Sequence, residues 1–419
     1  MTRKKVAIVC PTHRDARELK RLDYAQSIDL IWYGDDVSEH LEEFEPLRFL
    51  EDAARDLFDK NLSGIISTDD YPGSILGSIL AQEFHFLGPR PEVVIACQHK
   101  YRSRILQRQV VPDSTPLFSL IGPEASGFVD GEIELPFPFF IKPVKSFFSI
   151  LARTVSCEED VLDSLNRARN HWEVFVPPLA KLTKQYGDFS MRADCFIAEE
   201  ILVGSQVTVE GYVENGCATI LGVVDSVMFP GTFCFQRFEY PSRLSELVQE
   251  RMGDTAARLM KEIGFNNSLF NIEMMYDSSR DKISIIEINP RMSSQFADLY
   301  EKVDGVNSYE IQLKLALGTP VSYSRRNGKY AVAASFVLRT FADQRITRVP
   351  GNKEIKIVEE RFPDARIELF GAPGDMLSDL FQDGVSYRYG VINLGGMNWG
   401  ELTTFFKECE KTLTFTFEG

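Results

Sequence analysis

The stretch NIEMMYDSSRDKISIIEINPR, residues 271–291, has the pattern of two strands joined by a short polar loop. If the turn centres on that loop, Glu273 falls opposite Glu287. Side chains alternate across a strand, so Glu287 shares one face with Asn289 and Arg291. Two carboxylates that oppose each other across a strand pair repel, unless a cation lies between them. The hairpin therefore predicts either a cation site or a polar cluster at a sheet edge.

A metal ion is the interpretation that we favour for this face of the hairpin. Carboxylate and amide oxygens are ligands that Mg²⁺ and Mn²⁺ prefer, often with substrate phosphates completing the coordination. We predict Glu273, Glu287 and Asn289 as the metal ligands. A solvated acidic hairpin is the alternative. The opposite face is predicted to be apolar and to carry Ile272, Met274, Ile286 and Ile288.

Composition limits the classes of protein to which the chain can belong. Its 419 residues carry a net charge of −15, and 44% of them are hydrophobic. The length predicts two to three structural units, and the acidic balance argues against a nucleic-acid surface. No apolar run is long enough for a membrane span or a signal-peptide core. The seven cysteines and five histidines are scattered, which argues against a local zinc motif and leads us to expect a cytoplasmic protein.

The first 95 residues alternate strand-like and helix-like segments. KVAIVC (5–10), IDLIWYG (28–34) and SGIISTDD (63–70) are short apolar runs that end in turn residues. This rhythm predicts a small domain of βαβ units around a parallel sheet. Residues 69–71 would lie at the carboxyl end of a strand, where open α/β sheets bind ligands, although helix capping would explain them equally.

Longer strands and amphipathic helices follow this region. Residues 196–228 have the pattern of a strand, a turn and a hairpin. Residues 250–265 have the pattern of an amphipathic helix, with Gly264 as its stop. We predict an α/β (α+β) chain with three domains, at residues 1–95, 96–318 and 319–419, and with a lid subdomain at about residues 135–203.

Four motifs, taken in their order, resemble the ATP-grasp superfamily. They are HKYRSR (99–104), FFIKPV (139–144), AEEILVG (198–204) and the hairpin described above, and the resemblance covers about residues 96–318. In that superfamily two lysines contact the nucleotide, a hinge between strands holds the adenine, and a late Glu…Glu-x-Asn set binds two Mg²⁺ ions. The resemblance implies a lid and a central antiparallel sheet after the small N-terminal domain, followed by a C-terminal α+β subdomain.

The resemblance assigns a nucleotide site residue by residue. Lys100 and Lys142 match the two lysines, and Ser149 falls where relatives place a serine near the phosphates. Gln206 stands where many relatives carry an acid that holds the ribose hydroxyls, and an amide can also hydrogen-bond a hydroxyl. The full set predicted for ATP is Lys100, Lys142, Ser149, Glu199, Glu200, Ile201, Leu202 and Gln206.

The segment after the second lysine departs from the family pattern. Relatives carry a glycine-rich loop there, but VKSFFSILART (144–154) contains no glycine. Lys145 could supply positive charge to the site. Phe147 and Phe148 could either shield the phosphates from water or belong to the core of the lid.

A ligase is the activity that the resemblance implies. ATP would phosphorylate a substrate carboxylate, and a second substrate, most often an amine, would attack the acyl-phosphate. Glu287 would bridge two Mg²⁺ or Mn²⁺ ions, with Glu273 on one and Asn289 on the other. Arg291 would be catalytic, facing the transferred phosphoryl group. Arg237 is a candidate for gripping a substrate carboxylate.

Two alternatives to the ligase stay open. One is another reaction on the same fold, such as bicarbonate activation. The other is a non-catalytic nucleotide-binding module, which only the altered loop favours. We expect small-molecule carboxylate and amine substrates and neither nucleic acid nor membrane as a partner, and a homodimer is the assembly that we consider.

Overall fold

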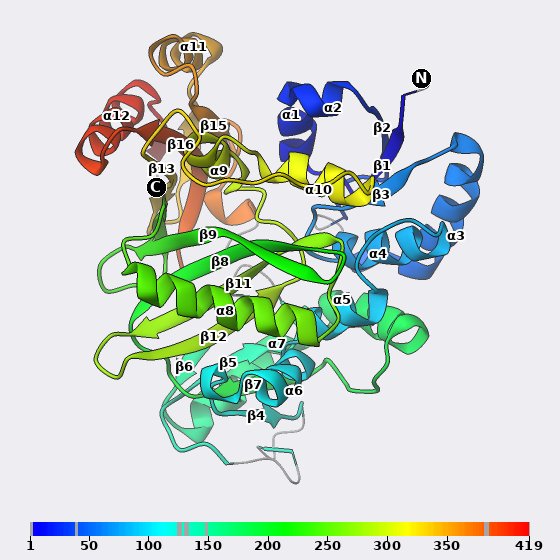
Figure 1. Cartoon of the computed structure of the whole chain (residues 1–419). Coiled ribbons are helices and arrows are strands. Elements are labelled where there is room, and N and C mark those ends of the chain that lie inside the picture. Colours follow the sequence, from blue (N-terminus) through cyan, green and yellow to red (C-terminus); the bar gives the residue numbers. More distant parts are fainter. Residues whose placement is uncertain are drawn as a thin grey trace.

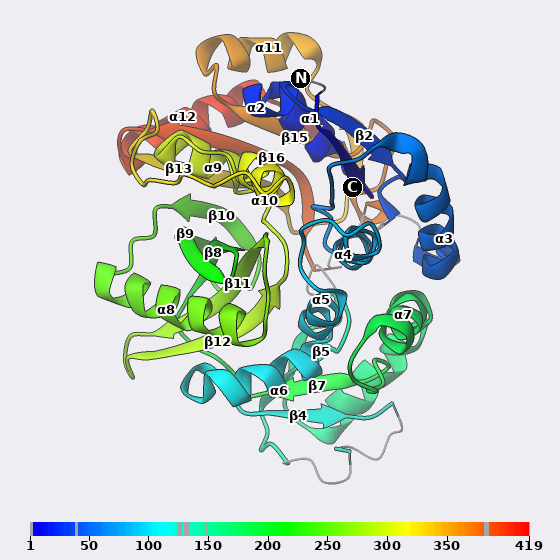
Figure 2. The same ribbon diagram turned by 45° about the vertical axis from the view of Figure 1, so that its right-hand side comes forward.

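The structure, a computed structural model, is organised around three main sheets (Figure 1). The N-terminal sheet and its helices lie at one end of the molecule, the lid lies at the other, and the largest sheet lies beside both (Figure 2). The structure describes residues 3–37, 41–123, 128–129, 134–146, 150–380 and 385–418.

A small parallel sheet opens the chain, in the order β2-β1-β3. Its central strand is buried on both faces, because Ala7 and Val9 join one core cluster and Val6 and Ile8 join another. The predicted N-terminal parallel sheet is confirmed. Its elements are β1 (Lys5–Val9), α1 (His13–Arg21), α2 (Asp23–Gln26), β2 (Asp29–Tyr33), α3 (Pro46–Leu57), β3 (Gly64–Ile66) and α4 (Gly73–Glu83).

The predicted lid region contributes three strands to a four-stranded antiparallel sheet in the order β4-β7-β5-β6, and this whole sheet is called the lid below, with β4 from before residue 135. The long helix α7 packs Leu165 and Trp172 against this sheet, and its later turns pack Phe175 and Leu179 into the core of the N-terminal domain. One helix therefore joins the lid to the N-terminal domain. The elements of this region are α5 (Pro91–Gln98), α6 (Lys100–Val110), β4 (Phe118–Ile121), β5 (Phe139–Pro143), β6 (Arg153–Val155), α7 (Glu158–Tyr186) and β7 (Phe196–Glu199).

The largest sheet has eight strands in the order β12-β11-β8-β9-β10-β13-β16-β15. It runs on past residue 318, because β13, β15 and β16 extend the same hydrogen-bonded ladder. Its elements are β8 (Ser205–Glu214), β9 (Cys217–Met228), β10 (Phe235–Tyr240), β11 (Ser268–Asp277), β12 (Lys282–Asn289), β13 (Val332–Thr340), β15 (Arg366–Leu369) and β16 (Tyr387–Gly396). The remaining elements are α8 (Glu246–Glu262), α9 (Ala297–Asp304), α10 (Ser308–Ala316), β14 (Arg345–Arg348), α11 (Asn352–Arg361), α12 (Trp399–Thr412) and β17 (Thr416–Glu418).

Helix α8 covers one face of this sheet. Met252, Ala256 and Leu259 are fully buried against the apolar side chains of β8 and β11, as the sequence pattern predicts. The helix ends before Gly264, whose φ of +76° is a conformation that glycine adopts without strain. The opposite face of the sheet is left for α9, α10 and the N-terminal domain.

In the β11–β12 hairpin, residues 271–273 pair as predicted, and the register shifts by one residue between Glu273 and the turn. Glu273 pairs with Glu287, and a β-bulge then offsets the register, so that Met274 pairs with Ile285. The prediction that Ile286 joins the apolar face is wrong. Ile285 is fully buried there, and Ile286 is the extra residue of the bulge and is partly exposed.

All seven cysteines are free thiols. In the part of the chain that the structure describes, no helix combines the length and apolar character that crossing a membrane requires.

Candidate active site

Three neighbouring strands carry the polar residues of the candidate site. Glu273 and Asn271 on β11 pair with Glu287 and Asn289 on β12. The third strand, β8, adds Glu210, which pairs with Asn271. These side chains lie on the face of the sheet opposite α8, because the residues that alternate with them belong to the core beneath that helix.

The two opposed carboxylates have different electrostatic surroundings. Lys100 Nζ lies 2.9 Å from Glu287 Oε1. Burial alone would raise the pKa of Glu287, but the charges of Lys100 and Lys142 lower it. For Glu273, burial and the nearby Glu287 raise the pKa to about 7. A further cation beside Glu273 would therefore favour its ionised form.

This donor set fits a divalent cation. Asn289 donates its Nδ2 to Asn271 Oδ1 at 2.9 Å, and none of the described residues donates to its own Oδ1, which can therefore act as a ligand. Two carboxylates and an amide oxygen are hard donors of the kind that Mg²⁺ prefers. Within the described ranges, no group of three or more His, Cys, Asp or Glu side chains is arranged to hold a metal ion. The site therefore needs the amide, together with oxygens from a ligand or water, to complete the coordination.

Lys142 projects from β5 into a buried network of ion pairs. Its Nζ lies 2.9 Å from Glu199 Oε2 and donates to the carbonyl oxygen of Ile286 at 3.1 Å. Arg104 donates to the same two residues, from Nε to Glu199 Oε1 at 2.5 Å and from Nη2 to the Ile286 carbonyl at 2.7 Å. The bulge takes Ile286 out of the ladder pairing, and its carbonyl is the acceptor that both cations use.

Arg104 is the residue of this network that the sequence interpretation missed. It is 2% exposed. A signal was available, because Lys100 and Arg104 are four residues apart and so lie on one face of α6.

The predicted hinge joins the lid to the central sheet. Strand β7 ends at Glu199 and β8 begins at Ser205. Gly204 has a φ of +132°, and a Cβ at this position would lie 2.1 Å from the carbonyl oxygen of Tyr276. Only glycine lets the chain pass this close to β11.

The acidic side chains at the hinge are engaged by protein groups, which leaves the backbone for a ligand. Glu200 Oε1 accepts from Lys282 Nζ at 3.2 Å and from the N–H of Leu117 at 3.1 Å. In the described part of the chain, Ile201 and Leu202 form no backbone hydrogen bond.

The remaining predicted residues are placed differently. Gln206 lies within the site, because its Nε2 donates to Glu273 Oε2 at 3.0 Å. Ser149, Phe147 and Phe148 lie outside the residues that the structure describes.

The structure does not bring Arg237 together with this set. Its neighbour Phe238 packs against Phe296 at 4.9 Å between ring centroids, on the side of the sheet that bears the carboxylates. By alternation, Arg237 faces the other side, where its Nε donates to Glu239 Oε1 at 2.7 Å.

Arg291 follows β12 and reaches the N-terminal domain. Its Nε lies 3.2 Å from Asp70 Oδ1. Burial would raise the pKa of Asp70, but the charges of Arg291 and Lys145 lower it. The neighbouring Asp69 has the capping role, accepting from the N–H of Gly73 at 2.8 Å. The two acids that follow β3 therefore have different tasks, and only Asp70 faces the candidate site.

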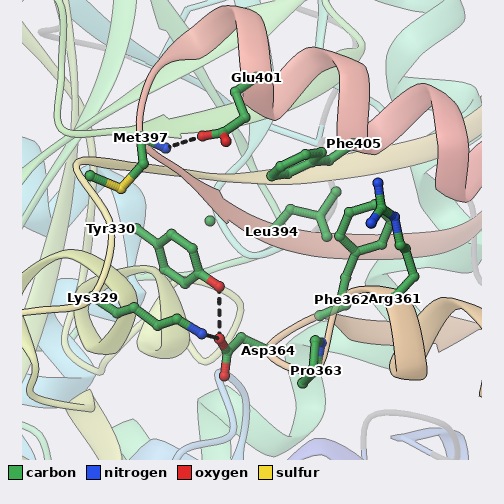
Figure 3. Close-up of a pocket in the computed structure, with 12 residues that line it drawn as sticks. Lys329, Tyr330, Arg361, Phe362, Pro363, Asp364, Leu394, Met397, Glu401 and Phe405 are labelled. Carbon is green, nitrogen blue, oxygen red and sulfur yellow. Dashed lines mark hydrogen bonds and ion pairs between the residues drawn. The ribbon is translucent and has the colours of Figure 1, made fainter.

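A separate cavity lies in the C-terminal part of the chain (Figure 3). It has a volume of about 320 Å³, and Tyr330, Phe362 and Phe405 form part of its wall. In its wall, Lys329 pairs with Asp364, and Tyr330 donates a hydrogen bond to the same carboxylate at 2.7 Å. None of the predicted site residues lines it, so it is distinct from the candidate active site.

Comparison with protein families finds a match to part of the chain. Residues 135–299 match the family model of the ATP-grasp domain. No curated protein sequence matches the chain.

Solved structures resemble the whole chain. An L-amino acid ligase from Bacillus licheniformis superposes with a TM-score of 0.73 at 14% identity, covering 100% of both chains. A phosphoribosylglycinamide synthetase from Anaerococcus prevotii gives a TM-score of 0.68 at 15% identity, over 99% of this chain and 100% of that one. The biotin carboxylase domain of a Hydrogenobacter thermophilus 2-oxoglutarate carboxylase was solved with MgADP and bicarbonate. It gives a TM-score of 0.68 at 16% identity, over 100% of this chain and 92% of that one.

The sequence match covers β5, β6 and β7 of the lid and the carboxylate hairpin, and the structural likeness extends over the rest of the chain. Residues 135–299 thus match an ATP-grasp domain, and the whole chain shares the fold of these solved structures.

Proposed function

We propose that the protein is an ATP- and Mg²⁺-dependent ligase that activates a carboxylate as an acyl-phosphate and joins it to an amine. The observation that carries this proposal is the opposed pair Glu273 and Glu287, with Lys100 and Arg291 beside it. Partly buried acids and cations in this arrangement suit a polyphosphate and its metal ion. The structurally similar proteins named as an L-amino acid ligase and a phosphoribosylglycinamide synthetase support the same reaction class.

The nucleotide would lie between the lid and the central sheet. Lys100 and Lys142 are compact charges that can offset the phosphates, and both are buried. The backbone at Ile201 and Leu202 offers hydrogen-bonding groups to an adenine, and Gln206 can hydrogen-bond a ribose hydroxyl.

Glu273, Glu287 and Asn289 would hold the metal, which we propose to be two Mg²⁺ ions. Mg²⁺, when bound there, neutralises charge on the transferred phosphoryl group. A carboxylate oxygen of the first substrate would attack the γ-phosphorus, and ADP would leave. The amine nitrogen of the second substrate would then attack the acyl carbon, lose a proton and release phosphate. Arg291 would hold the carboxylate and stabilise the charge that develops on the acyl-phosphate.

Bicarbonate activation is the second candidate, favoured by the similarity to biotin carboxylase domains. A non-catalytic nucleotide-binding module is the third candidate, and it does not account for the opposed carboxylates of Glu273 and Glu287. We further propose the three-domain division at residues 1–95, 96–318 and 319–419, a cytoplasmic location and a homodimeric assembly.

Phosphate release tests the proposal. The protein is incubated with ATP and Mg²⁺ and pools of amino acids or other carboxylic acids, with bicarbonate as a separate arm. We expect release that needs both a carboxylate and an amine. Release with bicarbonate alone would favour the second candidate, and ATP binding without release in any pool would favour the third.

A further inference from the structure

Arg291 is held by a chain of polar side chains that starts in another domain. Its Nε faces Asp70 Oδ1 at 3.2 Å, and its Nη1 donates to the carbonyl of Met292 at 3.0 Å. The main chain is fixed as well, because Asn271 Nδ2 donates to the carbonyl oxygen of Arg291 at 3.3 Å. Among the described residues, none accepts a hydrogen bond from Nη2. The guanidinium is thus held at Nε by an ion pair and at Nη1 by a hydrogen bond, and Nη2 is available to a ligand.

Gln98 fixes Asp70 in turn. Its Nε2 donates to the carboxylate Oδ1 of Asp70 at 3.0 Å and to the main-chain oxygen of the same residue at 2.9 Å. Its Oε1 accepts a hydrogen bond from Lys145 Nζ. Since an amide has one donor end and one acceptor end, Gln98 can link an acid to a cation without exchanging a proton.

Lys145 points to this link and is almost fully buried, at 2% exposure. Its Nζ also lies 4.2 Å from the centre of the Tyr71 ring, a cation–π contact. Its carbonyl oxygen lies 3.0 Å from His171 Nε2 on α7. The lysine that could have supplied charge to phosphates is thus directed at the N-terminal domain.

The three linked side chains come from three parts of the fold. Lys145 follows β5 in the lid, Gln98 ends α5, and Asp70 follows β3 in the N-terminal domain. Figure 2 shows α5 lying between α4 and β5. The position of the lid, through Lys145, can therefore affect the orientation of the Arg291 guanidinium. Gln98 and Asp70 are the two side chains between them.

We infer that Asp70, Gln98 and Lys145 are positioning residues, which orient Arg291 for the substrate carboxylate and make that orientation depend on the seating of the lid. The inference rests on the proposed function, in which Arg291 contacts the carboxylate and the acyl-phosphate. A guanidinium held at Nε and at one N–H of Nη1 presents its remaining N–H groups in a defined plane, which is what bidentate recognition of a carboxylate needs.

The test uses Asp70→Asn and Lys145→Met in the full-length chain. Lys145→Met keeps the volume of a buried side chain, so it remains informative if Asp70→Asn fails to fold. The control is Lys181→Met, because Lys181 also joins the lid helix to the N-terminal domain, through Glu45 at 2.6 Å, but at the surface and away from Arg291.

The first measurement needs no activity. The Nε–H of Arg291 is followed by ¹⁵N nuclear magnetic resonance and assigned by its loss in Arg291→Lys. We expect its hydrogen exchange to accelerate roughly tenfold or more in both variants and to stay unchanged in the control. Unchanged exchange in Lys145→Met would overturn the inference, and a loss of affinity for a non-hydrolysable ATP analogue with unchanged exchange would assign Lys145 to the phosphates instead.

The second measurement is kinetic, with the carboxylate that supports phosphate release. Both variants should lower kcat about tenfold or more and raise the KM for the carboxylate, while the KM for ATP stays within about twofold. A rise in the KM for ATP alone would overturn the inference. If the parent protein releases no phosphate in any pool, the proposed function fails while the exchange measurement still decides the positioning role.

Discussion

Lys142 is predicted to bind the nucleotide, and its side chain has well-defined partners in the structure. It is buried, and its ammonium group is shared between Glu199 and the carbonyl of Ile286. A phosphate would add a third partner to a charge that is already in place. We expect Lys142→Ala to weaken nucleotide binding about tenfold or more, because a hydrogen bond to a charged group contributes roughly 1.5–3 kcal/mol.

Calorimetric titration with a non-hydrolysable ATP analogue measures this effect. Lys181→Ala, at a partly exposed lysine of α7 that pairs with Glu45, is the matched control and should bind the analogue as the parent does. An unchanged affinity in a folded Lys142→Ala protein would mean that the lysine assignment is wrong.

The two opposed acids should respond differently to neutralisation. Glu273 has a raised pKa, so Glu273→Gln removes a repulsion and should hold or raise the melting temperature of the metal-free protein. Glu287 has a lowered pKa and pairs with the buried Lys100. Glu287→Gln should therefore lower the melting temperature of the metal-free protein and reduce its free energy of unfolding by about 1 kcal/mol or more. Both variants should lose Mg²⁺-dependent phosphate release.

Melting curves with and without Mg·ATP, recorded beside phosphate release, test this pair. The outcome that contradicts the two-metal assignment is an active Glu287→Gln protein that Mg·ATP stabilises as much as it stabilises the parent.

Site residues could be predicted where neighbouring positions in the sequence form a recognisable pattern. Glu273 and Glu287 followed from strand alternation and one turn, both of which are short-range. Asp70 was noticed only as a residue at a strand end, and its pairing with Arg291 joins positions 221 apart in the chain (291 − 70). No local pattern encodes such a pair.

The hinge between β7 and β8 depends on one glycine. An alanine at Gly204 would need an unfavourable φ and would bring its Cβ against the carbonyl of Tyr276. Gly216, at the other end of β8, also has a positive φ of +79°, but no atom lies within 4 Å of a Cβ built there. We expect Gly204→Ala to lower stability by roughly 2 kcal/mol or more and Gly216→Ala by about 1.

Thermal unfolding of both variants separates backbone strain from steric overlap. If the hinge also sets the backbone that faces the nucleotide, only Gly204→Ala should weaken binding of the ATP analogue. Equal losses of stability in the two variants would show that the contact with Tyr276 is unimportant.

The bulge in β12 shows where pattern reasoning about an element stops. Ile285 and Ile286 are adjacent apolar residues, and strict alternation had to assign one of them to the polar face. The pattern chose Ile286 for the core, whereas the fold buries Ile285 and uses the carbonyl of Ile286 for Lys142 and Arg104. The choice depends on cations from the lid and α6, which the hairpin sequence does not contain.

The continuity of the large sheet across residue 318 could not be predicted either. Strands β13 and β16 pair across a long connection, and non-local pairings leave no periodic signal. The N-terminal parallel sheet was predictable, because its strands and helices alternate at short intervals.

The first helix and the last strand of the sheet are joined by one carboxylate. Glu368 on β15 accepts from Arg14 Nε at 2.7 Å and also pairs with Arg17, both on α1 (Figure 2). Burial would raise the pKa of Glu368, but the two arginines lower it to about 2. The unfolded chain then binds more protons than the folded one between pH 2 and about 4.5, so this stabilisation is complete above pH 4.5 and is lost as the pH falls toward 2.

Glu368→Gln should therefore cost roughly 3 kcal/mol at neutral pH and much less near pH 2, since each unit of pKa shift corresponds to about 1.4 kcal/mol. Glu301→Gln is the control, because Glu301 forms a longer ion pair with the same helix, at 3.9 Å from Arg21, and its side chain is more exposed than that of Glu368. Urea unfolding of the parent and both variants at pH 7, 4.5 and 3 measures the difference. The stability curves of the parent and Glu368→Gln should converge as the pH falls, because protonation removes from the parent the charge that the glutamine lacks. Parallel curves at all three pH values would mean that the junction of the N-terminal domain with the C-terminal strands owes its stability to packing rather than to this ion pair.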